Sequence, residues 1–222
     1  MPIPTRDIKI APSLLAADLA RAGEEVARVQ TAGADLLHVD VMDAHFAPNL
    51  TFGPSLVESL NKVCDLPITT HLMVDDPGRF AEPFIKAGSN EMLFHIELDI
   101  DHAALADEIR RLGARPGVAL EMDTPAESIA ALAGKIDLAL VMTVKCGYTG
   151  QKFSPEPVKK IPALREMLGE DADIAIDGGV SYENAAMLAA AGANVFIAGK
   201  AIFWADDEAE AIGRIRTAAQ EA

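Results

Sequence analysis

Short apolar runs alternate with longer amphipathic segments along the whole chain. Eight runs are almost entirely apolar, and we expect a β-strand from each of them. They span residues 8–12, 36–42, 68–74, 92–96, 117–122, 138–144, 173–176 and 195–198. Strands that are apolar on both faces are typical of a parallel sheet covered by helices.

The segments between these runs carry apolar residues at helical spacing. We expect helices over residues 19–31, 54–62, 77–87, 102–113, 126–134, 157–168, 182–191 and 208–219, the second having the weakest pattern. Asp76 before Pro77 is a helix start signal, and Gly88 is typical of a helix end.

Eight strands that alternate with eight helices predict a (β/α)₈ TIM barrel, and the glycines in its last loops favour the phosphate-binding type. An open doubly wound sheet is the competing fold. It is disfavoured because no GxGxxG motif opens a helix and the glycine-rich turns occur late in the chain. No linker or shift of composition divides the sequence, so we expect a single domain over residues 1–222.

Composition narrows the classes of partner. Half of the 222 residues are hydrophobic, and the formal net charge is −15, which disfavours nucleic acid and anionic membrane surfaces as partners. Cys64 and Cys146 are too few and too far apart for a disulfide framework. The first 21 residues show no signal-peptide pattern, and no run of 18 uncharged apolar residues occurs. We therefore expect a cytoplasmic protein.

Polar residues at strand ends are candidates for chemistry, because barrel enzymes place their sites there. His38 and Asp40 share one face of the second strand, His71 lies in the third, and Asp177 follows the seventh. Each alone has a structural interpretation as a satisfied polar group or a turn former. Together they form a mixed nitrogen and oxygen set that suits Zn²⁺, Fe²⁺, Mn²⁺ or Co²⁺.

Glycines cluster in the loops after the last three strands. Such loops let backbone N–H groups approach an anion, although they are also typical of tight turns. The candidate phosphate-binding residues are Gly147, Gly150, Gly178, Gly179, Gly199 and the adjacent Lys200. The loops after strands 7 and 8 are the usual phosphate site of barrel enzymes.

Other polar and sulfur-containing residues have weaker interpretations. His45 follows the second strand and either contacts a ligand or caps a turn, and His95 with Glu97 repeats the spacing of His38 and Asp40. We interpret His95 as core or rim support. The methionines at strand ends are most simply core residues, and they are Met42, Met73 and Met142.

Taken together, the motifs resemble those of the ribulose-phosphate 3-epimerases of pentose-phosphate metabolism. The matching stretches are APSLLAAD at 11–18, HVDVMDAHFAPN at 38–49, HLMV at 71–74, VMTV at 141–144, GQKF at 150–153 and IDGGV at 176–180. They extend almost from end to end, and the second and third are highly specific together.

The resemblance implies an isomerase that interconverts D-ribulose 5-phosphate and D-xylulose 5-phosphate. One divalent metal (Zn, Fe, Mn or Co) would be held by His38, Asp40, His71 and Asp177, with no organic cofactor. The two aspartates would act as acid and base on opposite faces of the sugar, through a metal-stabilised enediolate. The implied substrate contacts are His71, Ser13, the three methionines Met42, Met73 and Met142, and the phosphate-binding glycines. We also predict a homo-oligomer.

The chain departs from the family pattern at several loop positions. Ala44 stands in place of a glycine, Cys146 in place of a proline, and Lys200 in place of a serine, and the turn at 120–125 reads LEMDTP. None is one of the four metal positions, so substrate identity is less determined than reaction class. A 3-epimerase of another ketose phosphate, such as D-allulose 6-phosphate, is the nearest alternative.

Two further function classes remain as alternatives. Phosphate-binding-barrel decarboxylases and aldol-type synthases resemble a D-x-K-x-x-D arrangement, and the corresponding stretch has no lysine. A non-catalytic binding barrel is disfavoured because four metal-ligand types and two acid–base carboxylates are present together.

Overall fold

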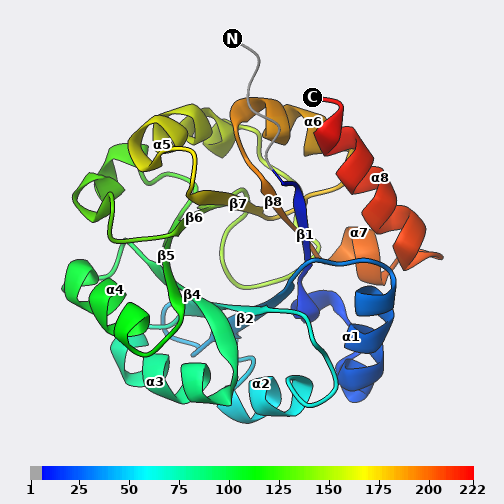
Figure 1. Ribbon diagram of the computed structural model, residues 1–222, viewed down its shortest axis with the longest axis horizontal. Helices are drawn as coiled ribbons and strands as arrows, with labels where there is room; N and C mark the ends of the chain where they lie inside the picture. The colour runs from blue at the N-terminus through cyan, green and yellow to red at the C-terminus, as the bar shows by residue number, and fades with distance from the viewer. Residues whose placement is uncertain (1–6) are drawn as a thin grey trace.

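The fold is a (β/α)₈ barrel with the strands at the centre and the helices around them, as the sequence predicts (Figure 1). It was obtained as a computed structural model that describes residues 7–222. Residues 1–6 of the predicted domain, which also begin the segment searched for a signal peptide, lie outside the described residues. Within residues 7–222, no helix is long and apolar enough to cross a membrane.

All eight predicted strands are present, with ends that differ from the expected ones by up to three residues. They are β1 (Lys9–Pro12), β2 (Leu37–Met42), β3 (Ile68–Met73), β4 (Ser89–His95), β5 (Arg115–Leu120), β6 (Leu138–Met142), β7 (Asp173–Asp177) and β8 (Val195–Ala198). Nearly every residue in them is buried, which explains why the sequence runs are apolar throughout.

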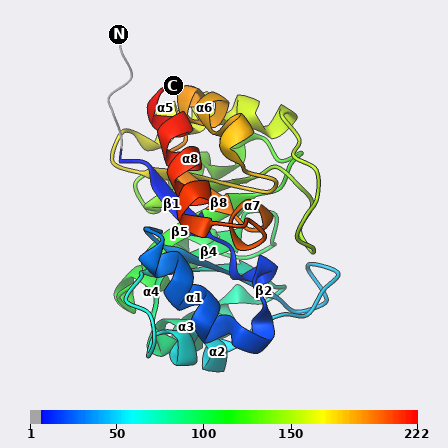
Figure 2. The ribbon, with the colours of Figure 1, turned by 90° about the vertical axis from the view of Figure 1, so that its right-hand side faces the viewer.

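The strands are parallel and pair in chain order from β2 through to β8, and β8 then pairs with β1. The seam between β1 and β2 is held by a bridge between Ser13 and His38 and by the N–H groups of Asp35 and Leu36, which donate to the carbonyl of Ile10. Because all strands point the same way, their carboxyl ends and the following loops lie at one face (Figure 2).

The helices follow the strands in the predicted order. They are α1 (Ala22–Thr31), α2 (Pro54–Leu60), α3 (Pro77–Ala87), α4 (His102–Arg111), α5 (Ile161–Leu168), α6 (Tyr182–Ala191), α7 (Lys200–Phe203) and α8 (Glu208–Gln220). Asp76 caps α3 by accepting from the N–H of Arg79, and Gly88 ends it with a φ of 118°. The weak pattern at 54–62 therefore does form a helix, and the short α7 adds one that the pattern did not predict.

One predicted helix is different in kind. Residues 126–134 form a 3₁₀ helix over Ala126–Leu132 rather than an α-helix. Pro125, in an extended conformation, precedes this segment, and Gly134, with a φ of 79°, follows it. A second 3₁₀ segment, Glu156–Lys160, leads into α5.

The hydrophobic core has two layers. One lies between the strands and the helices and contains Phe84, Phe94 and Phe196. The other fills the barrel and includes Leu93 and Leu138. At Gly117, on β5, an added Cβ would lie 2.4 Å from Leu138, so glycine leaves room for these interior leucines.

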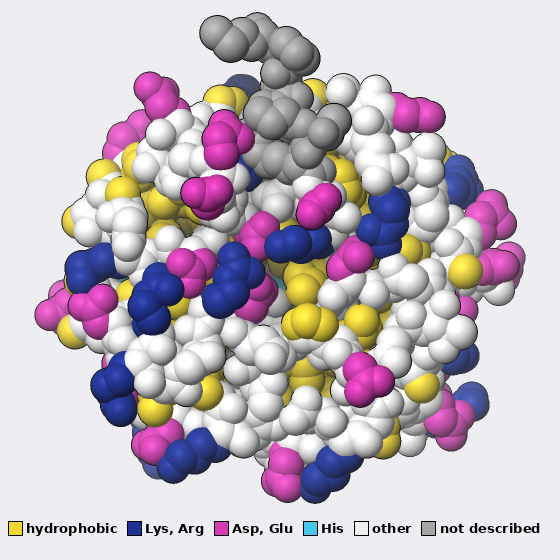
Figure 3. Space-filling model, viewed as in Figure 1, with side chains coloured by type: hydrophobic (Ala, Val, Ile, Leu, Met, Phe, Trp, Pro, Cys, Tyr) yellow, Lys and Arg dark blue, Asp and Glu magenta, His cyan; other side chains and the backbone are white. Residues whose placement is uncertain are grey.

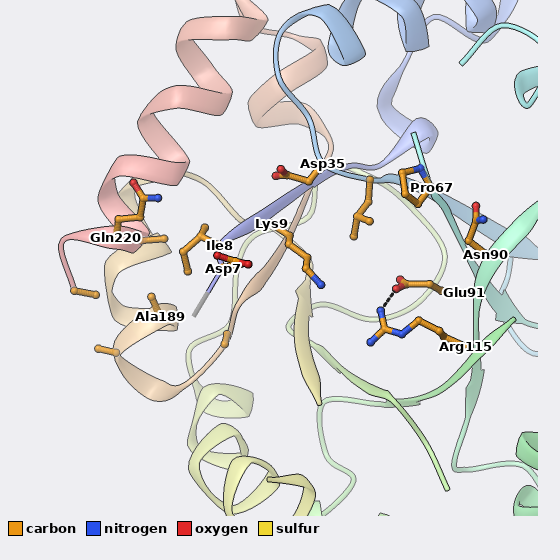
Figure 4. Close-up of a pocket in the computed structure, with 15 residues that line it drawn as sticks. Asp7, Ile8, Lys9, Asp35, Pro67, Asn90, Glu91, Arg115, Ala189 and Gln220 are labelled. Atoms are coloured by element: carbon orange, nitrogen blue, oxygen red, sulfur yellow. Dashed lines mark hydrogen bonds and ion pairs between the residues drawn. The ribbon is translucent and has the colours of Figure 1, made fainter. Parts of the chain in front are cut away.

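The amino-terminal mouth of the barrel is closed by paired charges. The ammonium of Lys9 contacts Asp173 at 2.9 Å, and Arg115 bridges Asp173 and Glu91. Thr69 donates to Glu91 at 2.6 Å. Lys9, Glu91 and Arg115 lie close together at the barrel end (Figure 4), and basic and acidic groups alternate over the centre of that face (Figure 3). Every member of this network has a partner of opposite charge or a hydrogen bond.

Candidate active site

The carboxyl ends of three strands bring four polar side chains together. His38 and Asp40 come from β2, His71 from β3 and Asp177 from β7, and one donor atom of each lies within 4.8 Å of the others. Both imidazoles are fully buried, Asp40 is 3% exposed, and Asp177 is half-buried. The four residues singled out from the sequence therefore form one cluster.

Asp40 is the centre of this cluster. Its Oδ1 lies 3.2 Å from His38 Nε2 and 3.3 Å from His71 Nδ1, and its Oδ2 accepts a hydrogen bond from the Ser13 hydroxyl at 2.7 Å. Asp177 Oδ2 lies 4.0 Å from His38 Nε2. Ser13, for which the family resemblance implies a substrate contact, therefore holds Asp40 in place. It also lines a cavity above the cluster.

A chain of hydrogen bonds behind His71 determines where its protons lie. The Glu97 carboxylate accepts from His95 Nδ1–H at 2.9 Å, which leaves His95 Nε2 as an acceptor. His71 Nε2–H donates to that acceptor at 2.9 Å. A neutral His71 therefore turns the lone pair of its Nδ1 toward the Asp40 carboxylate.

The His71 Nδ1 lone pair and the Asp40 carboxylate are both acceptors and face each other, so a cation between them can bind both. Burial is the main reason why the pKa of His71 is lowered to about 4, so the ring is neutral at physiological pH. Burial alone would raise the pKa of Glu97, but hydrogen bonds from His95 and Thr124 lower it to about 2. The residues present therefore fit a divalent metal, with two nitrogen and two carboxylate ligands.

The two aspartates differ in their protonation. Burial would raise the pKa of Asp40, but the neighbouring His38 and His71 outweigh it and hold that pKa well below its usual range. Burial and the charge of Asp40 raise the pKa of Asp177 to about 7. Burial would lower the pKa of His38, but Asp40 raises it overall. One carboxyl group is thus held as an anion while the other accepts a proton near neutral pH.

A cavity of about 760 Å³ opens above the cluster, a size that admits a small metabolite. Asp40 and Asp177 reach its surface. The other residues singled out from the sequence that line it are Ser13, Met42, Met73, Met142, Gly147, Gly150, Gly178, Gly179, Gly199 and Lys200. His38 and His71 do not line it and lie buried beneath.

The glycines after β7 bring backbone to the cavity wall. Gly178 has a φ of 115°, and an added Cβ would lie 2.7 Å from Val144. Gly179 has a φ of 65°, and its Cβ would lie 2.8 Å from the backbone nitrogen of Phe153. Both positions therefore need glycine on conformational and steric grounds.

Other sequence candidates lie outside the cluster. His45 is exposed, and its Nδ1 bonds to the carbonyl of Asp43, so it stabilises a turn. Lys200 lies at the cavity rim with its ammonium 5.1 Å from the ring centre of Trp204. Ala44, where the family pattern has glycine, has a φ of 63°, a left-handed conformation in which glycine is unstrained.

His95, which we interpret from the sequence as core or rim support, does support another residue. Its Nε2 contacts His71, and its Nδ1 contacts Glu97. The signal was present, because the spacing of His95 and Glu97 repeats that of His38 and Asp40. What the spacing does not reveal is which neighbouring strand each imidazole contacts.

Comparison with solved structures shows that other proteins share this barrel fold. The chain is similar to 3-keto-L-gulonate-6-phosphate decarboxylase from Vibrio cholerae, with a TM-score of 0.75 at 16% identity over 98% of this chain and 99% of that one. It is also similar to 3-hexulose-6-phosphate synthase from Salmonella typhimurium, with a TM-score of 0.70 at 19% identity over 96% of this chain and 99% of that one. At these identities the likeness shows the fold alone.

Comparison with curated sequences is more specific. Ribulose-phosphate 3-epimerase of Mycobacterium tuberculosis is 44% identical over 93% of this chain and 91% of its own length. Ribulose-phosphate 3-epimerase of Bacillus subtilis is 41% identical over 94% of this chain and 98% of its own length. The chloroplastic ribulose-5-phosphate-3-epimerase of Arabidopsis thaliana is 42% identical over 97% of this chain and 79% of its own length. The ribulose-phosphate 3 epimerase family matches residues 9–203. The chain therefore belongs to the ribulose-phosphate 3-epimerase family.

Proposed function

We propose that this protein is an isomerase that inverts C3 of a ketose phosphate, converting D-ribulose 5-phosphate to D-xylulose 5-phosphate. The observation that carries the proposal is the cluster of His38, Asp40, His71 and Asp177, with donor atoms within 4.8 Å of one another, on the floor of a cavity. Membership of the epimerase family and full-length relatives above 40% identity support it.

The proposed acid–base pair is Asp40 and Asp177. Epimerisation at C3 requires removal of a proton beside the carbonyl and its return to the opposite face. The two aspartates come from β2 and β7, which are three strand positions apart around the barrel by way of β1 and β8. Carboxylates from such separated strands can face a bound sugar from different sides, and positioned proton transfer contributes about 10²–10⁴-fold each.

His38, Asp40, His71 and Asp177 are the residues that would hold the metal, and we propose Zn²⁺, Fe²⁺, Mn²⁺ or Co²⁺ for it. When bound, a divalent cation supplies positive charge for the negative charge that develops on the substrate oxygens. The protein's own contribution is to orient the ligands: Ser13 holds Asp40, and the chain through His95 to Glu97 holds His71.

The phosphate is proposed to bind along the glycine loops. The cavity is lined by Gly147, Gly150, Gly178, Gly179 and Gly199, with Lys200 at its rim. Backbone N–H groups recognise an anion without a strong positive field, which suits a protein with a net charge of −15. A cytoplasmic location and a homo-oligomeric state remain predictions from the sequence.

An exchange assay tests the function. The protein, stripped of metal and reloaded separately with each proposed ion, is incubated in deuterated water with five-carbon and six-carbon ketose phosphates. We expect incorporation at C3 and the epimeric product with D-ribulose 5-phosphate, only after metal is added. The changed loops at 120–125 and 146–149 favour D-allulose 6-phosphate as the second candidate, which preferred turnover of the six-carbon substrate would reveal. Full activity in a verified metal-free sample would contradict the metal-dependent mechanism.

A further inference from the structure

A second group of metal-ligand side chains lies beside the first. His95 ends β4, Glu121 directly follows β5, and Cys146 lies in the loop after β6. One donor atom from each lies within 4.8 Å of the other two. We propose that these three residues form a second metal site, selective for a thiolate-binding divalent ion such as Zn²⁺ or Co²⁺.

The spacing of the donors fits zinc. His95 Nε2 and Cys146 Sγ are 3.7 Å apart. In a tetrahedral zinc site, the usual Zn–N and Zn–S bond lengths place the two ligand atoms about 3.6 Å apart. The two atoms are therefore at a suitable separation to bind one ion, once the hydrogen bond from His71 to His95 Nε2 is released.

The orientation of His95 is the one that a metal ligand requires. Its Nδ1–H donates to Glu97, so the lone pair of the ring lies on Nε2, on the side of Cys146. A carboxylate behind the imidazole is the usual support for a histidine ligand. Glu97 is itself held by the Thr124 hydroxyl and by the N–H of Glu121.

The local charge also favours a further cation. Glu97 and Glu121 add two carboxyl groups to those of Asp40 and Asp177. One positive charge is close to them, that of Lys160, whose ammonium donates to the backbone carbonyl of Glu121. Burial is the main reason why the pKa of the Cys146 thiol is raised, and the nearby Glu121 raises it further. The sulfur is therefore protonated until a metal binds. Binding then replaces the S–H proton, which passes to solvent, with a metal–sulfur bond.

The two sites share one lone pair. His95 Nε2 accepts the His71 N–H at 2.9 Å, and the same lone pair would bind the second ion. Filling the second site therefore removes the support of His71, and we expect it to weaken metal binding at the first site. Cys146 replaces the proline of the family pattern, and Glu121 lies in a turn that also departs from it, so the site is expected in this chain rather than throughout the family.

Cobalt titration tests the proposal without reference to catalysis, so its outcome is independent of the substrate assignment. Protein loaded with one equivalent of Co²⁺ is titrated with a second while the near-ultraviolet absorption is recorded. We expect a second equivalent to bind with a thiolate-to-cobalt charge-transfer band. Cys146→Ser should lose both the band and the second equivalent while retaining the first, which also shows that the variant is folded.

Two further variants sharpen the result. Cys64→Ser alters the other cysteine, which is remote from the cluster, and should keep the band. Glu121→Gln keeps the sulfur and should lower the affinity of the second site by at least about tenfold. Binding of a single equivalent by the wild type, or a band that persists in Cys146→Ser, would overturn the proposal.

Discussion

The two mouths of the barrel carry similar numbers of acidic groups but use them in opposite ways. At the amino end, Asp173 is contacted by Lys9 and Arg115, and Glu91 by Arg115. At the carboxyl end, Asp40 is contacted by two imidazoles and a hydroxyl, and Asp177 lies nearest to His38. The charges of the first set neutralise one another within the protein, whereas the second set would be completed by the proposed cation.

This difference explains why only one mouth is a candidate for catalysis. A paired network of charges contributes stability and leaves no group free to react. The buried carboxylates of the carboxyl mouth have the neutral imidazole of His71 among their partners, so negative charge is left uncompensated that a metal or a substrate can use. The amino end also has a cavity, lined by Lys9, Glu91 and Arg115 among others, but its polar groups already satisfy one another (Figure 4).

The largest expected effect comes from removing the proton-transfer groups of the carboxyl mouth. Asp40→Asn and Asp177→Asn each keep an oxygen ligand but cannot accept a proton. We expect each variant to retain measurable metal and to lose epimerisation by about 10²–10⁴-fold. One of them should still exchange the C3 proton of one epimer with solvent. Epimerisation near the wild-type rate by either metal-loaded variant would remove that aspartate from the mechanism.

The next effect concerns the support behind the ligands. Glu97→Gln removes the charge that fixes the His95 tautomer and should lower metal affinity by about 10–100-fold, measured by competition with a chelator. The free energy of unfolding of the metal-free protein should change much less, which separates positioning from a purely structural role. Glu108→Gln, at an exposed ion pair on α4, is the matched control and should leave metal affinity unchanged.

At the amino mouth we expect an effect on stability and none on turnover. Asp173→Asn should lower the free energy of unfolding by about 2 kcal/mol, because Lys9 and Arg115 lose a common partner. Urea unfolding measures this, with Asp107→Asn, at an exposed pair with Lys135, as a control that should change little. A fall in kcat in Asp173→Asn would contradict the division between the two mouths.

The same variant has a predicted pH dependence. Burial would raise the pKa of Asp173, but hydrogen bonds from Lys9, Asn194 and Arg115 lower it below its ordinary value of 3.8. A carboxyl group with a lowered pKa in the folded state stabilises it above the ordinary value and loses that contribution as pH falls. The difference between wild type and Asp173→Asn should therefore shrink below pH 3.8.

The smallest effect is expected at the rim of the carboxyl mouth. Lys200→Ser should raise KM for the phosphorylated substrate by about two- to fivefold, as is typical of an exposed charge, with kcat little changed. The ammonium lies over Trp204 at the edge of the cavity. An unchanged KM would show that Lys200 contacts only the Trp204 ring and not the phosphate. The control is Lys62→Ser, at an exposed ion pair after α2, which should leave KM unchanged.

The sequence alone determined the order of elements and the donor types at the metal cluster. Apolar runs buried on both sides are recognisable without any partner strand, and the alternation of side chains along a strand places His38 and Asp40 on one face. These properties are local, since they follow from backbone geometry within a few residues. The exception is the segment Ala126–Leu132, where the apolar spacing predicts a helix but not that its hydrogen bonds are of the 3₁₀ kind.

The tertiary structure decided which side chains from different strands meet. The contact of His71 with His95, the support of His95 by Glu97, and the approach of Cys146 to the same nitrogen join β3, β4 and the loop after β6. Such contacts depend on how neighbouring strands are aligned when the barrel closes, and no pattern within one strand encodes that alignment. The protonation of Asp40 and Asp177 likewise follows from burial and from neighbours distant in sequence, so it exists only in the folded chain.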